Sequence, residues 1–265
     1  TGLHYVTVSC VLIPAMTVLY FEQGGSRSGR KNGLIVLCVL VSVAIPILCV
    51  SRFQLVFAVI LAVFTFCASQ KNVSPWLFVA AVVALIPCYV LLTAARSHDV
   101  TYLNGIFEMK NSRMPIFVSQ PYIYIANNYE NFDCLVKALP AHTWGIRMLF
   151  PVWALTGLKF LYPYLVSFPI YVDKTELTTV TLIYDAYYDF GIIGVLVFAC
   201  ILGAVCFFLV EKLHEMKNPM GYLFYGQMAI YMMLSFFTTW FSNPTTWFYF
   251  LVTAVLTFYC SVSRR

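Results

Sequence analysis

Residues 34–68 read LIVLCVLVSVAIPILCVSRFQLVFAVILAVFTFCA, an apolar run that Ser51-Arg52 divides into two halves. Each half is close to the length that an α-helix needs to cross a hydrocarbon core of about 30 Å, at about 1.5 Å per residue. An unpaired charge at bilayer depth costs from about 3 kcal/mol upward. We therefore predict a hairpin of two membrane-spanning helices, with Ser51-Arg52 at a membrane surface between them.

The rest of the chain repeats this pattern of apolar runs and short polar breaks. Of its 265 residues, 61% are hydrophobic and 10% are charged, whereas a soluble domain carries about 25% charged residues. The composition predicts an all-α, polytopic integral membrane protein with about seven transmembrane helices. The predicted spans are Leu3–Phe21, Leu34–Val50, Phe53–Ala68, Trp76–Ala95, Val180–Val210, Tyr222–Phe241 and Thr245–Val262.

These spans divide the chain into three parts. Residues 1–95 hold the first four spans, residues 96–179 form one large polar region, and residues 180–265 hold three closing spans. Because Thr1 is not an initiator methionine and no charged segment precedes the first run, we expect the C-terminal part of a longer chain, or a processed chain.

The segment Trp144–Val172 is aromatic but is interrupted by prolines and charges. Prolines break helices, and aromatic side chains favour the headgroup zone of a membrane. We expect short interfacial or re-entrant helices here instead of a further span.

The loop charges predict the orientation, because cytoplasmic loops are enriched in Lys and Arg. The first loop carries Arg27, Arg30 and Lys31 and is therefore assigned to the cytoplasm. Alternation then places Ser51-Arg52 and the region 96–179 on the extracytoplasmic side, and the C-terminal arginines inside.

The cysteines and the net charge point to no cofactor and no nucleic acid. Eight of the nine cysteines lie in apolar runs, where a thiol behaves as a small hydrophobe, and Cys134 lies in the polar region. No CxxC or other metal-type spacing is present, so no metal site or disulfide framework is predicted. The net charge of +5 comes with no nucleic-acid-binding motif.

The segment Met114–Phe132 is dense in tyrosine and asparagine. Aromatic faces stack on sugar rings, and amide and phenol groups exchange hydrogen bonds with sugar hydroxyls. The candidate glycan-binding residues are Tyr122, Tyr124, Asn127, Asn128 and Tyr129. The alternative for this segment is a membrane-surface helix with its tyrosines among the headgroups.

Four arginines fall on the predicted external side, opposite to the direction that membrane insertion favours: Arg52, Arg96, Arg113 and Arg147. The planar guanidinium group suits bidentate pairing with phosphate and keeps its charge when partly buried. A pyrophosphate ligand would explain all four. The alternative is a set of salt bridges to Asp99, Glu108, Asp133, Asp173 and Glu176.

Three residues are candidates for a general base. His142 lies in the polar region, and Asp185 and Asp189 are four residues apart at the start of the predicted span 180–210. Residues at this spacing share one helical face. The alternatives are that the carboxylates pair with the arginines and that His142 is simply solvated.

Three of these features resemble the Wzy-type polymerases of bacterial surface polysaccharides, also called oligosaccharide repeat unit or O-antigen polymerases. They are Ser51-Arg52 at the start of a short helix, the Tyr/Asn-rich loop, and YDAYYDFGIIG at Tyr184–Gly194, which looks like the family's Asp-Phe-Gly-x-x-Gly motif. The resemblance extends from about Gly33 to the end of the chain. Related O-antigen ligases carry a His-Asn pair where this chain has Thr178-Thr179-Val180-Thr181.

The resemblance implies a metal-independent glycosyltransferase of the bacterial cytoplasmic membrane, with its active site on the extracytoplasmic side. It would transfer a growing glycan from undecaprenyl pyrophosphate to a new lipid-linked repeat unit, with a chain-length regulator as a further partner. Arg52 and Arg96 would contact the pyrophosphate with help from Arg113 or Arg147, and His142, Asp185 or Asp189 would accept the proton.

Other functions predict other features. An O-antigen ligase-like enzyme would use the same carrier lipid, and a transporter or flippase of lipid-linked sugars would also need external arginines. A transporter is expected to have repeats or charges near mid-membrane, whereas the ionisable residues here cluster at helix ends. A receptor is indicated only by the helix count, and a structural subunit would have no use for so polar an external region.

Overall fold

A computed structural model of the chain describes residues 2–49, 51–70, 72–95 and 99–262. This part of the chain is helical and contains no β-strand. Six of its helical segments are long and apolar enough to cross a membrane, which is consistent with a polytopic membrane protein. They are His4–Glu22, Gly29–Leu48, Arg52–Ser69, Trp76–Ala94, Tyr184–Lys212 and Pro244–Val262. Six of the seven predicted spans therefore correspond to helices of sufficient length.

The chain divides into two compact units. Unit 1 consists of residues 1–98, 208–230 and 249–265, and unit 2 consists of residues 99–207 and 231–248.

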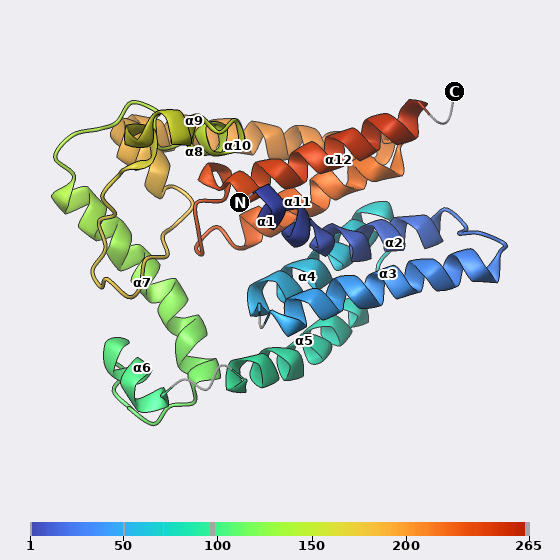
Figure 1. Cartoon of the computed structure of the whole chain (residues 1–265), viewed down its shortest axis with the longest axis horizontal. Helices are drawn as coiled ribbons and strands as arrows, with labels where there is room; N and C mark the ends of the chain where they lie inside the picture. The colour runs from blue at the N-terminus through green and yellow to red at the C-terminus, as the bar shows by residue number, and fades with distance from the viewer. Residues whose placement is uncertain (1, 50, 71, 96–98, 263–265) are drawn as a thin grey trace. The chain divides into compact units, whose positions relative to one another are not determined.

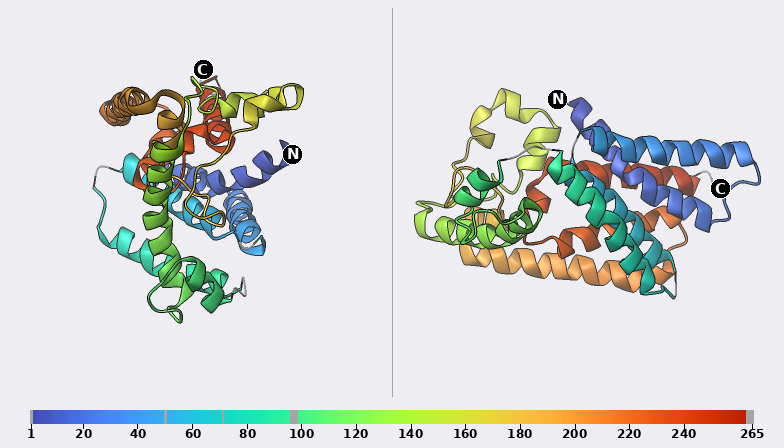
Figure 2. Two further views of the ribbon diagram at one scale, coloured as in Figure 1. Left: turned by 90° about the vertical axis from the view of Figure 1, so that its left-hand side faces the viewer. Right: turned by 90° about the horizontal axis from the view of Figure 1, so that it is seen from below.

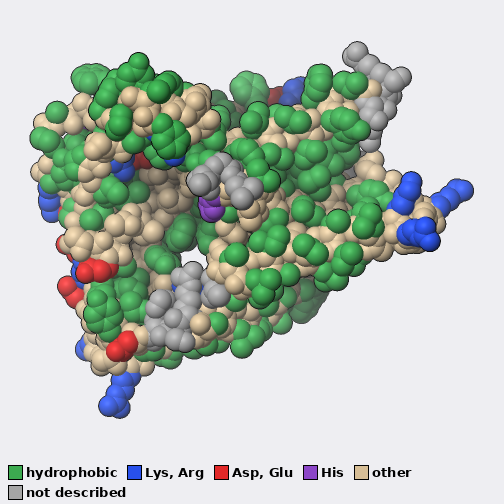
Figure 3. Space-filling view, viewed as in Figure 1, with side chains coloured by type: hydrophobic (Ala, Val, Ile, Leu, Met, Phe, Trp, Pro, Cys, Tyr) green, Lys and Arg blue, Asp and Glu red, His purple; other side chains and the backbone are tan. Residues whose placement is uncertain are grey.

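Unit 1 is built around a group of long helices that lie side by side (Figure 1). Its N-terminal elements are α1 (Gly2–Val8), η1 (Ser9–Leu12), α2 (Ile13–Glu22), α3 (Gly29–Leu48), α4 (Arg52–Ser69) and α5 (Trp76–Ala94). Helix α4 contacts α2, α3 and α5, and Leu12, Leu19 and Leu61 are almost fully buried. Most other faces of these helices remain apolar and exposed, as expected for helices that face lipid (Figure 3).

The predicted hairpin at Ser51-Arg52 is present, because α3 ends at Leu48 and α4 begins at Arg52. The Arg52 side chain is buried, and its Nη1 donates a hydrogen bond of 2.9 Å to the hydroxyl of Thr93 on α5. Its guanidinium carbon lies 5.5 Å from the centre of the Tyr89 ring. A hydroxyl acceptor and an aromatic face thus stabilise this charge at the end of a candidate membrane-spanning helix.

The C-terminal elements of unit 1 are η3 (Leu213–Glu215), η4 (Pro219–Gly221), most of α11 (Tyr222–Met233) and most of α12 (Pro244–Val262). Gln227 of α11 donates a hydrogen bond of 2.7 Å to the Thr253 hydroxyl of α12. The Tyr249 hydroxyl donates to the Val8 carbonyl at 3.0 Å. Such bonds hold membrane helices together where the hydrophobic effect between them is weak.

Gly226 marks the closest approach of α11 to α4. A Cβ atom at this position would lie 2.7 Å from Oγ1 of Thr65 and 3.0 Å from Cδ1 of Leu61. We expect Gly226→Ala to destabilise the protein by about 1–3 kcal/mol, the usual effect of overpacking. Thermal unfolding in lipid nanodiscs measures this change.

Two further variants separate the clash from other effects of the substitution. Thr65→Ala removes the clashing hydroxyl and should restore part of the lost stability in the double variant. Gly203 lies in a helix with nothing within 4 Å of its missing Cβ, so Gly203→Ala should be neutral or mildly stabilising. Equal destabilisation by both glycine substitutions would contradict the packing argument.

Unit 2 contains α6 (Val100–Ile106), α7 (Ile116–Ala138), α8 (Phe150–Leu155), α9 (Leu158–Leu161), η2 (Pro163–Val166), most of α10 (Tyr184–Lys212) and η5 (Trp240–Ser242). Helix α7 is the long helix of this unit outside the candidate spans, and α6 packs near its start (Figure 2). The segment Trp144–Val172 contains only short helices, as the prolines predicted. Their place at a membrane surface remains a prediction.

Three asparagines on one side of α7 hold the extended segment that leads to α10. Asn127 and Asn131 both donate to the Leu177 carbonyl, at 3.1 and 2.7 Å. Asn131 also donates to the Thr179 carbonyl at 2.8 Å, and Asn128 accepts a bond of 2.6 Å from the Thr179 hydroxyl. These amides satisfy backbone groups that no helix or sheet would pair.

The prediction of a seventh span over Tyr222–Phe241 is not confirmed. Helix α11 ends at Met233 and has 12 residues, whereas about 20 are needed to cross a hydrocarbon core. The residues that follow form turns and then η5. Their backbone carbonyls accept hydrogen bonds from residues that are distant in sequence. The Ser235 carbonyl accepts from the Leu182 amide at 2.8 Å, and the Phe236 carbonyl accepts from the Asn128 side chain at 2.6 Å. Backbone of this kind can replace a helix in a membrane protein because the protein satisfies its polar groups.

Candidate functional site

The candidate site is formed by the first two turns of α10 and the loop Leu139–Leu149 that precedes α8. Helix α10 is interrupted at Gly191, whose φ of 63° and ψ of −149° are not helical. Only glycine adopts this conformation readily. Gly194 follows within the next turn, where a Cβ would lie 2.5 Å from the Ala186 carbonyl oxygen. The glycines of the Asp-Phe-Gly-x-x-Gly motif thus shape the start of this helix.

Asp189 anchors the loop to α10. Its side chain is fully buried and accepts hydrogen bonds from the Met148 amide at 2.7 Å, the Arg147 amide at 3.3 Å and the Thr143 hydroxyl. The loop can turn its amides toward this carboxylate because Gly145 has a φ of 96°. Asp189 therefore acts as an internal cap for the loop.

Asp185, one turn earlier on the same face, forms an ion pair with Arg147 through Nε. The side chains of Arg147 and Asp185 are 14% and 5% exposed, so the pair is largely removed from solvent. The Arg147 guanidinium carbon lies 5.2 Å from the centre of the Tyr184 ring and 4.6 Å from that of Tyr188. Two aromatic faces and a carboxylate therefore fix the orientation of this cation.

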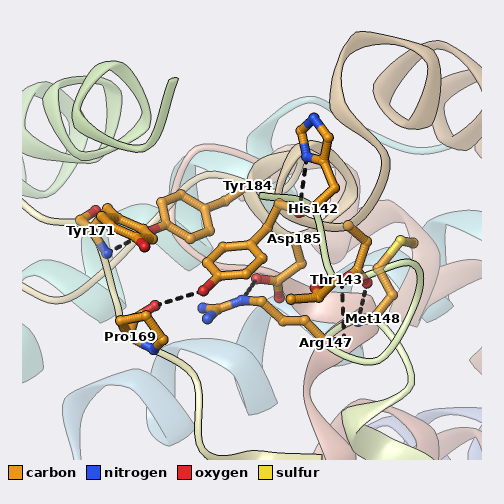
Figure 4. Close-up of polar contacts among 10 residues, drawn as sticks. His142, Thr143, Arg147, Met148, Pro169, Tyr171, Tyr184 and Asp185 are labelled. Atoms are coloured by element: carbon orange, nitrogen blue, oxygen red, sulfur yellow. Dashed lines mark hydrogen bonds and ion pairs between the residues drawn. The ribbon is translucent and has the colours of Figure 1, made fainter. Parts of the chain in front are cut away.

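The two tyrosines also secure the chain beside the arginine (Figure 4). The Tyr184 hydroxyl donates to the Tyr171 carbonyl and accepts from the Tyr171 amide, both at 2.9 Å. The Tyr188 hydroxyl donates to the Pro169 carbonyl at 3.2 Å. Because Nε is the Arg147 side-chain nitrogen that is bonded to Asp185, the terminal amino groups are left without a hydrogen bond to any described residue. This edge of the guanidinium group can bind an oxyanion.

His142 lies on the same loop and is exposed. Its Nδ1 lies 3.2 Å from the Tyr188 carbonyl oxygen, and its ring meets the Tyr187 ring edge-on with centroids 6.0 Å apart. A Cβ at Gly191 would lie 3.0 Å from Nε2 of His142. The break in α10 therefore makes room for the imidazole ring.

An apolar groove of about 320 Å³ runs from Met148 along one face of α10. It is lined by Met148, Phe190, Ile193, Gly194, Val197, Phe198 and Ile201. Met148 is also the residue whose amide binds Asp189, so the groove begins beside the loop that carries Arg147. The loop Leu139–Leu149 thus contributes Arg147 to the ion pair with Asp185 and Met148 to the apolar groove.

The four predicted phosphate-binding arginines are not shown to converge. Arg147 is in the site described above, and Arg113 is exposed in the turn before α7. Arg52 belongs to unit 1, and Arg96 lies outside the described residues. The alternative was that the arginines form salt bridges with five acidic residues. Two of these acidic residues pair with lysines instead: Glu108 with Lys174 at 2.9 Å and Asp133 with Lys137 at 2.5 Å.

The predicted glycan-binding residues divide into two groups. Tyr122 and Tyr129 are about 60% exposed along α7, and Tyr124 is half-buried with its ring against Phe237. Asn127 and Asn128 are buried, and their amide nitrogens donate to backbone carbonyls. These two asparagines have a structural role that composition alone did not reveal.

Several site residues were not predicted from the sequence. Tyr184 and Tyr188 contact Arg147, and Thr143 and Met148 bind Asp189. The i, i+4 spacing of the two tyrosines places both on one helical face, adjacent to the face that Asp185 and Asp189 share. This spacing was the sequence signal that could have identified the tyrosines as site residues. No local pattern indicated Thr143 or Met148.

Comparison of the chain with protein-family models, with curated proteins and with solved structures finds no match. The family resemblance of the sequence therefore remains a prediction.

Proposed function

We propose that this protein lengthens a bacterial surface glycan at the extracytoplasmic face of the cytoplasmic membrane. It would transfer the growing chain from undecaprenyl pyrophosphate to a new lipid-linked repeat unit. In this proposal the acceptor hydroxyl attacks the anomeric carbon of the donor, and the bond from that carbon to the pyrophosphate oxygen breaks. The leaving group carries away the electron pair, so fixed cations near it lower the barrier.

The setting of Arg147 is the observation that carries this proposal. Its Nε is bonded to Asp185, its guanidinium carbon lies 5.2 and 4.6 Å from the centres of two tyrosine rings, and its terminal amino groups form no hydrogen bond to a described residue. A guanidinium group held in this way binds a phosphate oxygen pair without losing further side-chain freedom. The apolar groove that begins at Met148 offers a place for the first part of a polyprenyl chain.

The local charge indicates that Arg147 does not act alone. With Asp185 and Asp189 ionised, the three side chains carry one more negative than positive charge. Binding of a pyrophosphate therefore needs further cations, and Arg52, Arg96 and Arg113 remain the proposed sources. The exposed rings of Tyr122 and Tyr129 are the proposed contacts to the glycan.

The proposal is tested by comparing surface glycan length in cells with and without the gene. Cells that lack it should carry single repeat units and no ladder, and the gene on a plasmid should restore the ladder. Complete polymer that accumulates on undecaprenyl pyrophosphate, with none attached to its final acceptor, would indicate a ligase. Repeat units confined to the cytoplasmic face would indicate a flippase.

A further inference from the structure

The imidazole ring of His142 is bound at a break in a helix. Gly191 interrupts the regular geometry of α10, and two carbonyl groups just before it accept hydrogen bonds from the loop. The Asp189 carbonyl accepts from the Trp144 amide at 3.1 Å, and the Tyr188 carbonyl lies 3.2 Å from Nδ1 of His142. The loop therefore contacts the helix through backbone groups as well as through the Asp189 side chain.

The Tyr188 contact determines which nitrogen of His142 carries the proton. A carbonyl oxygen can only accept a hydrogen bond, so Nδ1 must be the donor. The neutral ring then has an unprotonated Nε2, whose lone pair is available as a base. In Figure 4 this second nitrogen lies at the outer end of the ring, away from the other labelled residues.

The two carboxylates are poorly suited to the same task. Asp189 is fully buried, and its oxygens accept three hydrogen bonds from the loop. Asp185 is bound to Arg147 and is 5% exposed. A general base must reach the proton that it removes, and of the three candidates only His142 is exposed.

One residue connects this base to the cation. The ring of Tyr188 lies against Arg147, and its carbonyl oxygen contacts His142. Movement of Tyr188 would therefore displace both groups together. This coupling keeps the base and the leaving-group cation in a fixed relation, as a transfer reaction requires.

We infer that His142 is the general base of the proposed transfer and that Gly191 and the Tyr188 carbonyl are its positioning groups. This inference rests on the proposed function. The acceptor hydroxyl oxygen forms the new bond to the anomeric carbon, and its proton passes to Nε2 of His142. The bond from that carbon to the pyrophosphate breaks with its electron pair, and the imidazolium then releases the proton to solvent.

The first test measures glycan lengthening by membranes that contain the protein. The substrate is the lipid-linked single repeat unit that accumulates in cells lacking the gene. We expect His142→Ala to lower the rate by at least about 100-fold, the usual contribution of a general base, and added imidazole to restore part of it. His4→Ala, at an exposed histidine of unit 1, is the matched control and should retain the wild-type rate.

A second measurement does not depend on activity. The ¹⁵N spectrum of histidine-labelled protein, assigned with His142→Ala, should show Nδ1 protonated and Nε2 unprotonated in the neutral ring. Gly191→Ala should change this signal and lower the lengthening rate, because the added Cβ would lie 3.0 Å from Nε2.

The outcomes distinguish the inference from the function on which it rests. A His142→Ala protein with the wild-type rate, or one whose lost activity imidazole does not restore, would overturn the role of His142. A proton on Nε2 in the neutral ring would overturn the positioning by Tyr188. Wild-type membranes that lengthen no glycan would refute the proposed function, while the tautomer would still test the positioning.

Discussion

Arg147→Ala is expected to abolish glycan lengthening, leaving single repeat units, and Arg147→Lys is expected to restore only a small part of it. Alanine removes the cation proposed to stabilise the pyrophosphate leaving group. Lysine returns the charge but not the planar group that contacts the rings of Tyr184 and Tyr188. Loss of a fixed donor at a developing oxyanion typically costs about 10²–10³ in rate. Glycan length on gels, at equal amounts of protein in the membrane, measures the effect.

Loss of stability has to be separated from loss of chemistry in this experiment. Arg147→Ala leaves the buried Asp185 carboxylate without its partner, and breaking such a pair costs about 3–5 kcal/mol. The double variant Arg147→Ala/Asp185→Asn removes the uncompensated charge and should recover much of the lost stability. Lengthening should remain absent in it. Recovery of the ladder together with stability would show that Arg147 has only a structural role.

The sequence predicted the long apolar helices well because apolar length is a local property. The division of the run 34–68 at Ser51-Arg52 matches the end of α3 and the start of α4. The run Tyr222–Phe241 had the same apolar character, yet only Tyr222–Met233 is α-helical. Its final turns are held by Asn128 and the Leu182 amide, which are distant in sequence. No property of the run itself reveals such partners.

The candidate site was predicted only in part for the same reason. The spacing of Asp185 and Asp189 placed both on one helical face, and the structure adds that they serve different partners. The predicted side of the membrane grouped four arginines, of which the structure describes one in this site. Asn127 and Asn128 were predicted to bind sugars, because residue type alone does not distinguish a buried structural amide from a ligand-binding one. Only tertiary contacts distinguish the two.

Asp189→Ala is expected to have the largest effect on stability of any substitution in the loop region. It removes the acceptor for the Thr143 hydroxyl and for the amides of Arg147 and Met148, all at a fully buried position. Each buried donor left without a partner costs about 1–3 kcal/mol. Thermal unfolding in nanodiscs should show a large loss, and proteases should cleave the loop Leu139–Leu149 faster.

Two further variants provide reference values for the loss of stability in Asp189→Ala. Asp133 is an exposed aspartate that pairs with Lys137 four residues away on α7, with side chains 58% and 72% exposed. Asp133→Ala should change stability by less than about 1 kcal/mol, because exposed ion pairs contribute little. Thr143→Val removes one of the three donors and should fall between the two. If Asp189→Ala were as mild as Asp133→Ala, the loop would not depend on this carboxylate, and the positions of Arg147 and His142 would need another explanation.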